Sequence, residues 1–509
     1  MVNSSHCLGP GSHLVVTRMN YEPLPSMPMF KHQEEAWLKT RDEPVWGLLF
    51  EQRCGKSRVL LDTAGWLYSQ GKINGLLVIA PKEVCRSAWE QEQVPKFLNT
   101  PHEVARWNSS KSKKVVQKLD SICKQGDRLK VLIVNVEAFS GSGGSNVVAF
   151  CKRFMKTHRT LLAVDESSTI KERTSKRTDR VLQLASFAYY RRILTGTPIT
   201  QSPLDAFTQF GFLETKLFGS NWYSFRARYA ELGDTYVKLP KRDEPTIIKT
   251  VQGYRNLEEL SEKMATLSTR VKRSDCFDLP PKMYSKLDVD LTTEARRLYN
   301  LMAQKQVLAL EAEGIVTPAM AVSRIMSLRQ ITSEFLMQHD DVTGLDTKLE
   351  LGNERVKLLL KQVTDLEGQV IIWTAFQHSQ QRIPEALREA GIATSVLVGS
   401  TVDRPEQLEA FKAGRTRVLV INQGLGQYGL DLSMADWAIY YEHEWSVEKR
   451  VQSEDRAQHP QRTKSVGYID LIVPGTIEET ILDAVLSGRK LADLIVDRGW
   501  KTLFKEIEV

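Results

Sequence analysis

Two series of short, unbroken apolar runs, each followed by a plausible helix, constrain the fold of this chain most strongly. The first series is residues 45–50, 76–80, 131–136, 161–164 and 192–195. The second series is residues 370–374, 395–398, 418–421, 437–441 and 468–473. Runs that are unbroken rather than alternating are typical of parallel strands covered by helices on both faces. The sequence therefore predicts an α/β protein with two parallel-sheet domains in tandem.

The stretch between the two series, residues 202–350, has a different pattern. Segments 258–272 and 293–313 have the apolar spacing of helices and carry many charges, and Leu279-Pro280-Pro281-Lys282 interrupts them. We therefore expect a mostly helical insertion between the two domains. Residues 475–498 again have helical spacing, which indicates a C-terminal helix packed back on the domains.

The length of the chain fits this division. A chain of 509 residues is too long for one hydrophobic core, and a size of roughly 150 residues per domain suggests about three folding units. The predicted parts are a disordered N-terminal tail (1–24), the first domain (25–215), the insertion and linker (216–350), the second domain (351–474) and a C-terminal helical brace (475–509).

Composition indicates an ordinary soluble protein, which we expect in the cytoplasm. The chain is 42% hydrophobic and 26% charged, with a formal net charge of +7. This mildly basic balance fits a polyanionic partner, but it fits an ordinary solvated surface equally well. No apolar run reaches the ~18 residues of a membrane span, and the N-terminus lacks a signal-peptide pattern. The six cysteines are scattered without paired metal-ligand spacing, which favours a reducing compartment and argues against structural zinc.

Two motifs at strand ends carry the chemistry. Gly55-Lys56-Ser57 follows the run 45–50 and opens a helix, as in a phosphate cradle in which Lys56 reaches the terminal phosphates and Ser57 ligates magnesium. Asp165-Glu166 closes the run 161–164 and supplies one carboxylate for the metal and one to activate water. A solvated lysine and a helix N-cap are the plainer interpretations of each motif taken alone. Because ligands of doubly wound sheets collect at the carboxyl ends of strands, the pair predicts a nucleoside triphosphatase with Ser57 and Asp165 as metal ligands.

Further short motifs follow one another along the chain. In the first half they are Phe30-Lys31-His32-Gln33, Glu51-Gln52-Arg53-Cys54-Gly55-Lys56-Ser57, Ile79-Ala80-Pro81-Lys82, Asn135-Val136-Glu137, Asp165-Glu166-Ser167-Ser168 and Leu194-Thr195-Gly196-Thr197-Pro198. Later ones are Leu279-Pro280-Pro281-Lys282, Leu328-Arg329-Gln330, Gly429-Leu430-Asp431-Leu432 and Gln452-Ser453-Glu454-Asp455-Arg456-Ala457. In this order they resemble the Swi/Snf-type DNA translocases of helicase superfamily two, and more narrowly their compact, phage-like members. The resemblance covers residues 30–491.

The resemblance implies two RecA-like domains and an ATP site built from both. Gln33 would hold the adenine, Cys54, Gly55, Lys56 and Ser57 the phosphates, and Asp165 the Mg²⁺. Glu166, Gln452 and Arg456 would be catalytic, with Arg456 as an arginine finger from the second domain. Gly429, Asp431 and Arg462 would complete nucleotide binding. ATP and Mg²⁺ are the implied cofactors.

Double-stranded DNA is the partner that the resemblance implies first, with single-stranded DNA or RNA next and a protein partner as a source of specificity. Ile79-Ala80-Pro81-Lys82 and Asn135-Val136-Glu137 resemble the family's strand-end segments that contact a nucleic-acid backbone. Lys82 is therefore a candidate for such a contact. Arg173, Lys176 and Arg177, in the basic run 171–180, are either phosphate contacts or a solvated face. The aromatic residues Trp222, Tyr223, Phe225 and Tyr229, interleaved with Arg226 and Arg228, fit a local core better than a base-stacking platform.

Three positions depart from the family pattern. Arg53 stands in the phosphate loop where small residues are usual, and it points away from the phosphates or adds charge to them. Ser167-Ser168 replaces the usual pair that ends in histidine. In the family that histidine links hydrolysis to the coupling segment, which Leu194-Thr195-Gly196-Thr197-Pro198 resembles. Ser168 could make that hydrogen bond to Thr195 or Thr197 instead. His459 occupies the place of a second arginine. Either Arg462 replaces that arginine, or Arg456 acts alone.

These features leave four hypotheses. The first is an ATP-dependent motor that translocates on double-stranded DNA, with nucleic acid stimulating hydrolysis. The second is a strand-separating DNA or RNA helicase. The third is a clamp that binds ATP and DNA but hydrolyses poorly, and the fourth is a motor subunit whose specificity comes from a partner.

Overall fold

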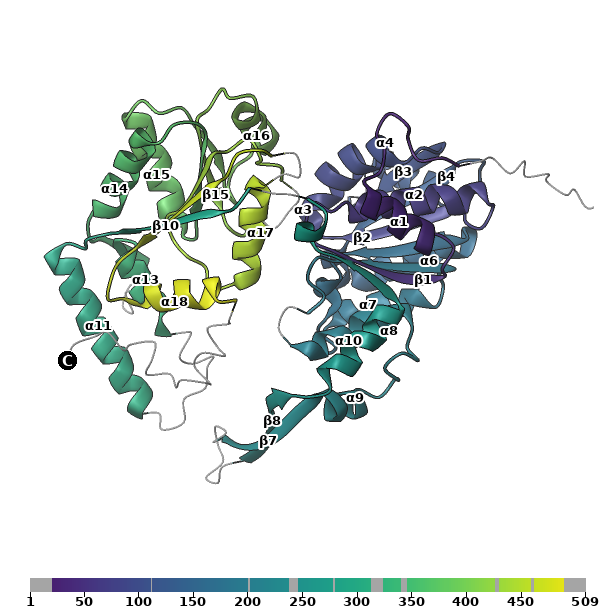
Figure 1. Ribbon diagram of the computed structural model, residues 1–509, viewed down its shortest axis with the longest axis horizontal. Helices are drawn as coiled ribbons and strands as arrows, with labels where there is room; N and C mark the ends of the chain where they lie inside the picture. The colour runs from purple at the N-terminus through teal and green to yellow at the C-terminus, as the bar shows by residue number, and fades with distance from the viewer. Residues whose placement is uncertain are drawn as a thin grey trace, which may run out of the picture. The chain divides into compact units, whose positions relative to one another are not determined.

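The computed structural model describes residues 21–110, 112–199, 202–237, 246–277, 280–312, 324–339, 346–425, 430–458 and 462–488. The chain divides into two compact units. The first unit comprises Met1–Glu231 and Val251–Cys276, and the second comprises Leu232–Thr250 and Phe277–Val509. Each unit is built on one large sheet (Figure 1).

The first unit contains a seven-stranded sheet in the order β3-β4-β2-β5-β6-β1-β9. Every neighbouring pair is parallel. The strands are β1 (Val45–Phe50), β2 (Gly75–Ala80), β3 (His102–Arg106), β4 (Leu129–Asn135), β5 (Thr160–Asp165), β6 (Tyr190–Leu194) and β9 (Ser268–Val271). All residues of β2 and β5 are buried, as expected for central strands with both faces covered.

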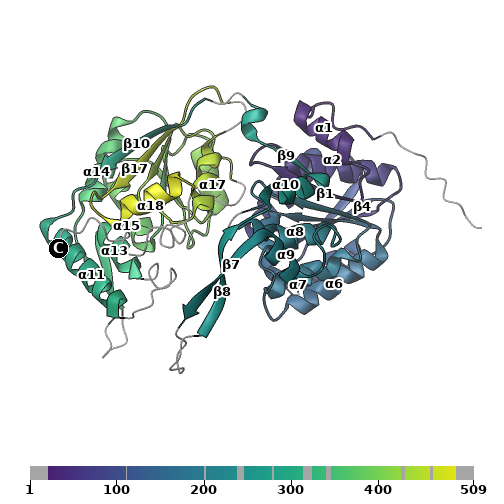
Figure 2. The ribbon, with the colours of Figure 1, turned by 60° about the horizontal axis from the view of Figure 1, so that its bottom comes forward.

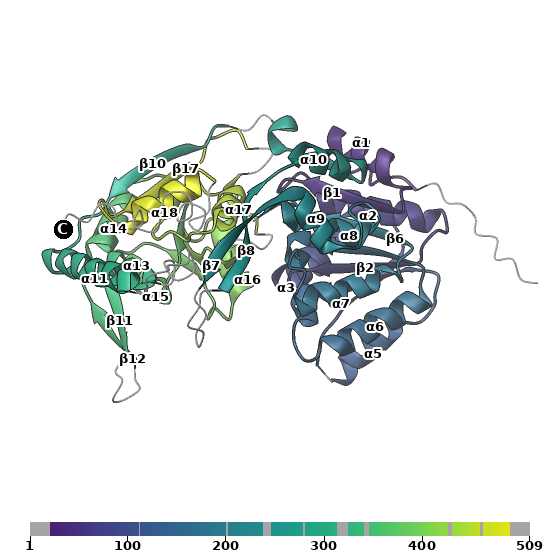
Figure 3. The same cartoon turned by 90° about the horizontal axis from the view of Figure 1, so that it is seen from below.

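The helices of the first unit are α1 (Lys31–Thr40), α2 (Lys56–Ser69), α3 (Lys82–Val84), α4 (Val94–Phe97), α5 (Lys113–Ile122), α6 (Gly144–Thr157), α7 (Lys176–Ala185), α8 (Ala206–Leu213), α9 (Trp222–Tyr229) and α10 (Leu257–Thr266). Short 3₁₀ turns are η2 (Val136–Phe139), η3 (Ser167–Ile170), η4 (Pro203–Asp205) and η5 (Arg273–Asp275), and η1 (Cys85–Gln93) is a π-helix. Figure 3 shows α5, α6 and α7 together beside the first sheet. Their buried side chains share one core with alternate residues of the central strands, such as Leu77, Leu132 and Leu162.

The second unit contains a six-stranded parallel sheet in the order β10-β17-β16-β13-β15-β14. The strands are β10 (Met283–Asp288), β13 (Val370–Thr374), β14 (Thr394–Leu397), β15 (Val418–Asn422), β16 (Trp437–Tyr440) and β17 (Gly467–Ile472). The helices are α11 (Thr293–Ala312), α13 (Met326–Thr332), α14 (Glu354–Asp365), α15 (Gln377–Glu389), α16 (Arg404–Lys412), α17 (Val447–Ala457) and α18 (Ile477–Leu486).

The central strand β13 shows why the apolar runs are unbroken. Ile372 belongs to a core that includes Leu359 of α14 and Ile383 of α15. Its neighbour Trp373 belongs to a second core, on the opposite face, which includes Phe411 of α16. Both faces of the strand are therefore buried against helices. The two parallel-sheet domains predicted from the sequence are confirmed.

Residues 216–350 contain more strand than the sequence pattern indicates. The pair β7 (Ala230–Val237) and β8 (Thr246–Tyr254) forms a two-stranded ribbon (Figure 2), and β11 (Phe335–His339) pairs antiparallel with β12 (Asp346–Glu350). The segment 258–272, which has helical spacing, ends its helix at Thr266, and β9 then adds an edge to the first sheet. An edge strand needs few apolar residues because only part of it is covered. In β9 the buried residues are Ser268 and Val271.

The C-terminal helix α18 packs within the second unit. Ile481 of α18 lies in one apolar cluster with Tyr299 of α11 and Leu328 of α13, and the backbone N–H of Ile477 donates to the Tyr299 hydroxyl over 2.8 Å. The predicted brace therefore holds α11 and α13, while its last part lies outside the described residues. None of the helices in the described ranges is long and apolar enough to cross a membrane.

A close approach between β16 and β17 supplies a test of the second sheet. Trp437 and Gly467 are paired in the ladder, and a Cβ at Gly467 would lie 2.1 Å from the Trp437 ring. We expect Gly467→Ala to lower the free energy of unfolding by about 1–3 kcal/mol, since overpacking a close contact forces neighbours apart. Calorimetric unfolding measures the change.

Gly143→Ala is the matched control, because a Cβ at Gly143 meets no atom within 4 Å. The double variant Trp437→Leu, Gly467→Ala should lose less stability than the sum of the two single variants. Strict additivity would contradict the steric explanation.

Candidate active site

The phosphate loop joins β1 to α2 and has a constrained backbone. Gly55, the residue before α2, has φ +85°, and Arg53 has φ +66°. A Cβ at Gly55 would lie 2.1 Å from Gln33 Nε2, so glycine is required by both conformation and space. No described side chain caps the start of α2. The first N–H groups of this helix are therefore available to an anion, which fits the phosphates of ATP.

Helix α1 is fastened to this loop through two side chains. Gln33 Nε2 donates to the carbonyl oxygen of Cys54 over 3.2 Å, and His32 Nε2 lies 2.9 Å from the same oxygen. Gln33 Oε1 accepts from the backbone N–H of Phe30 at 3.1 Å. Gln33 thus positions the phosphate loop in this structure. Its contact with adenine stays a prediction.

The Asp165–Glu166 pair lies at the same sheet edge as the loop, because β6 pairs with β5 on one side and β1 on the other. Lys56 Nζ is 3.9 Å from Glu166 Oε1, and Gln52 Nε2 donates to that oxygen over 3.2 Å. Glu166 has φ +49°, a conformation that non-glycine residues adopt rarely and that is frequent at functional sites. The two motifs predicted to share a site therefore do so.

Asp165 is buried, and its carboxylate has neutral partners. Its Oδ2 accepts from the Trp89 indole N–H at 2.8 Å, and its Oδ1 accepts from the backbone N–H of Glu166 at 3.1 Å. Burial, followed by the charge of Glu166, raises the pKa of Asp165 to about 6, while Lys56 and Trp89 act in the opposite direction. The Ser57 hydroxyl at the start of α2 and the Asp165 carboxylate are the hard oxygen donors that Mg²⁺ prefers, so these residues fit the predicted metal.

Trp89 supports this site but belongs to none of the sequence motifs. It is 1% exposed and lies in the π-helix η1, a rare element that is frequent at functional sites. Trp89 and Asp165 are 76 positions apart in sequence, so no local spacing connects them. The signal present in the sequence is only a tryptophan shortly after Ala80-Pro81-Lys82.

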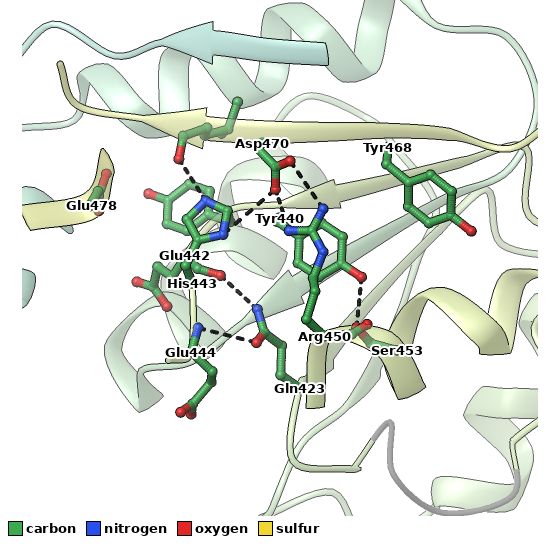
Figure 4. A network of polar contacts seen from close by, with 12 residues as sticks. Gln423, Tyr440, Glu442, His443, Glu444, Arg450, Ser453, Tyr468, Asp470 and Glu478 are labelled. Atoms are coloured by element: carbon green, nitrogen blue, oxygen red, sulfur yellow. Dashed lines mark hydrogen bonds and ion pairs between the residues drawn. The ribbon is translucent and has the colours of Figure 1, made fainter. Parts of the chain in front are cut away.

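In the second unit, Gln452 and Arg456 both lie on α17, which a buried ion-pair network fixes to the sheet (Figure 4). Arg450 pairs with Asp470 of β17 and with Glu454, and its guanidinium lies 3.5 Å from the Tyr440 ring centroid. Burial alone would raise the pKa of Glu454, but Lys282 and Arg450 hold it below its usual range.

The start of α17 and the Tyr440 hydroxyl complete this anchorage. The Ser446 hydroxyl accepts from the backbone N–H of Lys449 over 3.2 Å and so caps the helix. The Tyr440 hydroxyl bonds to Ser453 over 2.7 Å (Figure 4). The helix that carries two predicted catalytic residues is thus held at its first turn and along one face.

The predicted site residues of the second unit are placed as follows. Gln452 Nε2 donates to Glu448 over 3.3 Å, and Gln452 Oε1 is buried with no partner among the described residues. Arg456 is 5% exposed, and its carbonyl accepts from Leu432 N over 3.1 Å, which joins α17 to the Asp431 segment. Gly429 and His459 lie outside the described residues.

Arg462 is occupied by contacts within the second unit. Its guanidinium donates to the carbonyls of Ser433 and Lys464, and it lies 3.5 Å from Asp436 Oδ1. Asp431 Oδ1 accepts from the backbone N–H of Ser433 at 3.1 Å. Arg462 therefore braces the segment that carries Asp431. A role for either residue in nucleotide binding stays a prediction.

The candidate nucleic-acid contacts lie in two places on the first unit. The backbone N–H of Lys82 donates to Glu137 over 3.0 Å, which ties together two strand-end segments. Arg173 lies 5.5 Å from the Trp222 ring centroid, Lys176 begins α7, and Arg177 Nε donates to the Ser140 hydroxyl over 2.9 Å. Their binding of nucleic acid stays a prediction.

The aromatic cluster of α9 is a local core, as expected. Phe225 and Tyr229 are buried in the main core of the first unit, and Trp222 packs against it. Tyr223 is 73% exposed and points away from that core.

The hydrogen bond from Ser168 to Thr195 or Thr197 that the sequence allows is not formed among the described residues. Among the described residues, the Thr195 hydroxyl accepts from Thr197 N at 3.1 Å. Ser167, the preceding residue, instead donates to Gln209 of α8 over 2.7 Å.

Comparison with known proteins agrees with this geometry. The model of the SNF2-related domain matches residues 28–337, and that of the helicase conserved C-terminal domain matches residues 354–460. These matches define an ATP hydrolase of the helicase-like superfamily. The chain belongs to the SNF2-related, or Swi/Snf, family.

Individual relatives are distant and much longer. The SWI/SNF-related matrix-associated actin-dependent regulator of chromatin subfamily A member 1 of Mus musculus is 23% identical over 88% of this chain and 41% of its own length. The ATP-dependent helicase brm of Drosophila melanogaster is 24% identical over 66% of this chain and 22% of its own length. The chain thus spans well under half of these relatives. Among solved structures, the Sulfolobus solfataricus SWI2/SNF2 ATPase core in complex with dsDNA is 18% identical, covers 94% of this chain and 97% of its own, and has a TM-score of 0.40.

The contact between Gly55 and Gln33 gives a prediction for the phosphate loop. Gly55→Ala should weaken binding of a fluorescent ATP analogue by about tenfold or more, equivalent to about 1.4 kcal/mol, because it adds both backbone strain and a collision. In the double variant Gly55→Ala, Gln33→Ala the loss should be smaller than the sum of the two single losses, because removing the Gln33 side chain also removes the collision. Fluorescence titration measures both effects.

Gly391→Ala is the control, since Gly391 has φ +73° but no atom within 4 Å of its Cβ position. A Gly55→Ala protein that binds the analogue as tightly as this control would contradict the proposed cradle.

The Arg450 network gives a second prediction. Arg450→Met should destabilise the second unit by about 3–5 kcal/mol, because it leaves buried carboxylates without their partner. The double variant Arg450→Met, Asp470→Asn should be less destabilised than Arg450→Met. Chemical denaturation followed by circular dichroism measures the difference.

Lys449→Met is the neighbouring control. Its ion pair with Glu444, at 3.4 Å, is more exposed, so it should change stability by less than about 1 kcal/mol. Equal losses for Arg450→Met and Lys449→Met would show that α17 is not anchored as described.

Proposed function

We propose that this chain is a Mg²⁺- and ATP-dependent motor that translocates on double-stranded DNA. The observation that carries the proposal is the convergence of the phosphate loop and the Asp165–Glu166 pair at one sheet edge, with Lys56 Nζ 3.9 Å from Glu166. Membership of a family whose relatives include chromatin-remodelling ATPases and a helicase supports DNA as the substrate track. The net charge of +7 is consistent with a polyanionic partner.

The residues of the first unit divide the chemical work. The start of α2 and Lys56 bind the phosphates of ATP. Ser57 and Asp165 would hold Mg²⁺, which supplies charge neutralisation at the phosphates when bound. Gln52 and Lys56 both contact Glu166 Oε1. We therefore assign the other carboxylate oxygen, Glu166 Oε2, as the base that accepts a proton from the attacking water.

Gln452 and Arg456 are the proposed contributions of the second domain. A cation such as Arg456 stabilises the negative charge that develops on the transferred phosphoryl group. The rigid anchorage of α17 by Arg450 supports this assignment, because a catalytic side chain needs a fixed helix beneath it. Hydrolysis would then alter how the two domains hold the nucleic acid, which is the basis of stepping.

The test measures ATP hydrolysis without nucleic acid and with duplex DNA, single-stranded DNA or RNA. We expect duplex DNA to stimulate the wild-type protein most strongly. Glu166→Gln should lower the stimulated rate by about 10²–10⁴-fold, the usual contribution of a general base. Displacement of a triplex strand without unwinding of duplex DNA distinguishes translocation from strand separation.

Lys56→Ala serves as a second variant in the same experiment. It should abolish ATP binding while the fold is retained, since the lysine acts on the substrate. Wild-type turnover no faster than that of Glu166→Gln on every nucleic acid would contradict the motor and leave an ATP-dependent DNA-binding clamp. Stimulation by single strands together with duplex unwinding would support a helicase instead.

A further inference from the structure

A buried glutamine on α8, Gln209, connects two segments at the edge of the first sheet. Its Oε1 accepts from the Ser167 hydroxyl at 2.7 Å. Its Nε2 donates to the carbonyl of Pro198 over 2.6 Å and to that of Asp205 over 2.9 Å. Gln209 and Ser167 are both 0% exposed, so water does not compete for these bonds.

The partners determine the orientation of this amide. Two carbonyl oxygens can only accept, so they must face the amide nitrogen, and the remaining amide oxygen must accept from the Ser167 hydroxyl. Reversing the amide would place an acceptor against two acceptors. Removing Ser167 or Gln209 would leave a buried polar group unsatisfied, which is unfavourable. The connection therefore has one geometry and depends on both residues.

Each end of this connection lies beside a part of the hydrolytic site. Ser167 directly follows Asp165 and Glu166 at the end of β5. Pro198 ends the segment 195–198, which follows β6. Thr195 N donates to Leu48 O of β1 over 3.2 Å, so this segment starts beside the strand that leads to the phosphate loop.

Gly196 brings the same segment against the phosphate loop itself. A Cβ at Gly196 would lie 3.3 Å from Glu51 Cα and from Phe50 O, so the backbones pack closely here. The segment 195–198 therefore touches the phosphate loop at Gly196 and is tied to the end of β5 through Gln209. Direct contacts thus connect this segment with both parts of the hydrolytic site.

We propose that Gln209, together with Ser167, is a positioning residue that couples the state of the hydrolytic site to the segment 195–198. The pair does the work that the sequence pattern assigned to Ser168, but through a side chain of α8 rather than by direct contact. Both side chains are fully buried, so they act through their neighbours. This inference rests on the proposed function, since the segment is the one expected to relate hydrolysis to movement on DNA.

The test uses Ser167→Ala and Gln209→Met, with Ser167→Thr as the conservative variant that keeps the hydroxyl. Two quantities are measured: the ratio of duplex-stimulated to basal ATP hydrolysis, and triplex strand displaced per ATP hydrolysed. Ser167→Ala and Gln209→Met should lower both by about fivefold or more, the lower range of coupling between sites, with the KM for ATP nearly unchanged. Ser167→Thr should keep both near wild type.

Thr160→Val is the matched control for a merely structural role. Thr160 lies at the other end of β5, is 0% exposed, and donates its hydroxyl proton to His158 O over 2.9 Å. It should lower Tm about as much as Ser167→Ala and leave both ratios unchanged. The double variant Ser167→Ala, Gln209→Met should be no worse than the single variants, because they break one connection.

A second measurement needs no DNA. Hydrogen exchange of the amides of residues 195–197 and 199 is compared with and without a non-hydrolysable ATP analogue. The analogue should change exchange in the wild type and in Ser167→Thr, but not in Ser167→Ala or Gln209→Met. This response is independent of translocation.

The outcomes separate the two proposals. A wild-type protein that duplex DNA does not stimulate, but whose exchange response disappears in Gln209→Met, contradicts the proposed motor and supports the coupling. A stimulated wild type whose variants keep both the ratios and the exchange response overturns the role of Gln209. Equal losses in Thr160→Val and Ser167→Ala also overturn it, because they show a general effect of stability.

Discussion

The parallel pairing of β6 with β1 on one side and β5 on the other is the constraint on which the first unit depends. Parallel strands place all their carboxyl ends at one edge of a sheet, so two motifs more than a hundred positions apart must meet there. The ladder brings Lys56 and Glu166 within ion-pair distance. It also places the segment 195–198 between them, since that segment follows the shared neighbour β6. The site is therefore a consequence of strand order, because the order of the strands decides which strand-end residues are neighbours.

Sequence reasoning recovered the central strands well because each is buried on both faces. The unbroken runs that predict β2, β5 and β13 are apolar for that reason. The strands missed within the two large sheets, β3, β9 and β10, are all at sheet edges. The other missed strands, β7, β8, β11 and β12, form two-stranded sheets, in which every strand is an edge. In β10 five of the six residues are exposed and none is buried, so no apolar pattern exists to be recognised. Edge strands form because a neighbour offers hydrogen bonds, and that information lies in the neighbour.

The same distinction holds within the site. The motifs located Gly55, Lys56, Asp165 and Glu166, because each belongs to a local string that performs its own chemistry. The supporting residues Trp89 and Gln209 were not located, because their partners are 76 and 42 positions away. Whether a tryptophan or glutamine supports a site depends on which elements pack together. The prediction for Ser168 failed for the same reason: the choice between adjacent serines is made by the orientation of η3 and by α8, which presents Gln209 to Ser167.

The two units hold their predicted functional groups by different electrostatic means. Arg450 pairs with Asp470 and Glu454, and Lys282 also pairs with Glu454, so the anchorage of α17 is a cluster in which two cations compensate two carboxylates. Asp165 has a neutral indole N–H and a backbone N–H as partners, and burial raises its pKa to about 6. A carboxylate held in this way keeps its geometry while its charge is only partly balanced. A divalent cation held by Asp165, as proposed above, would complete that balance, because hard oxygen donors of this kind are the ligands that Mg²⁺ prefers.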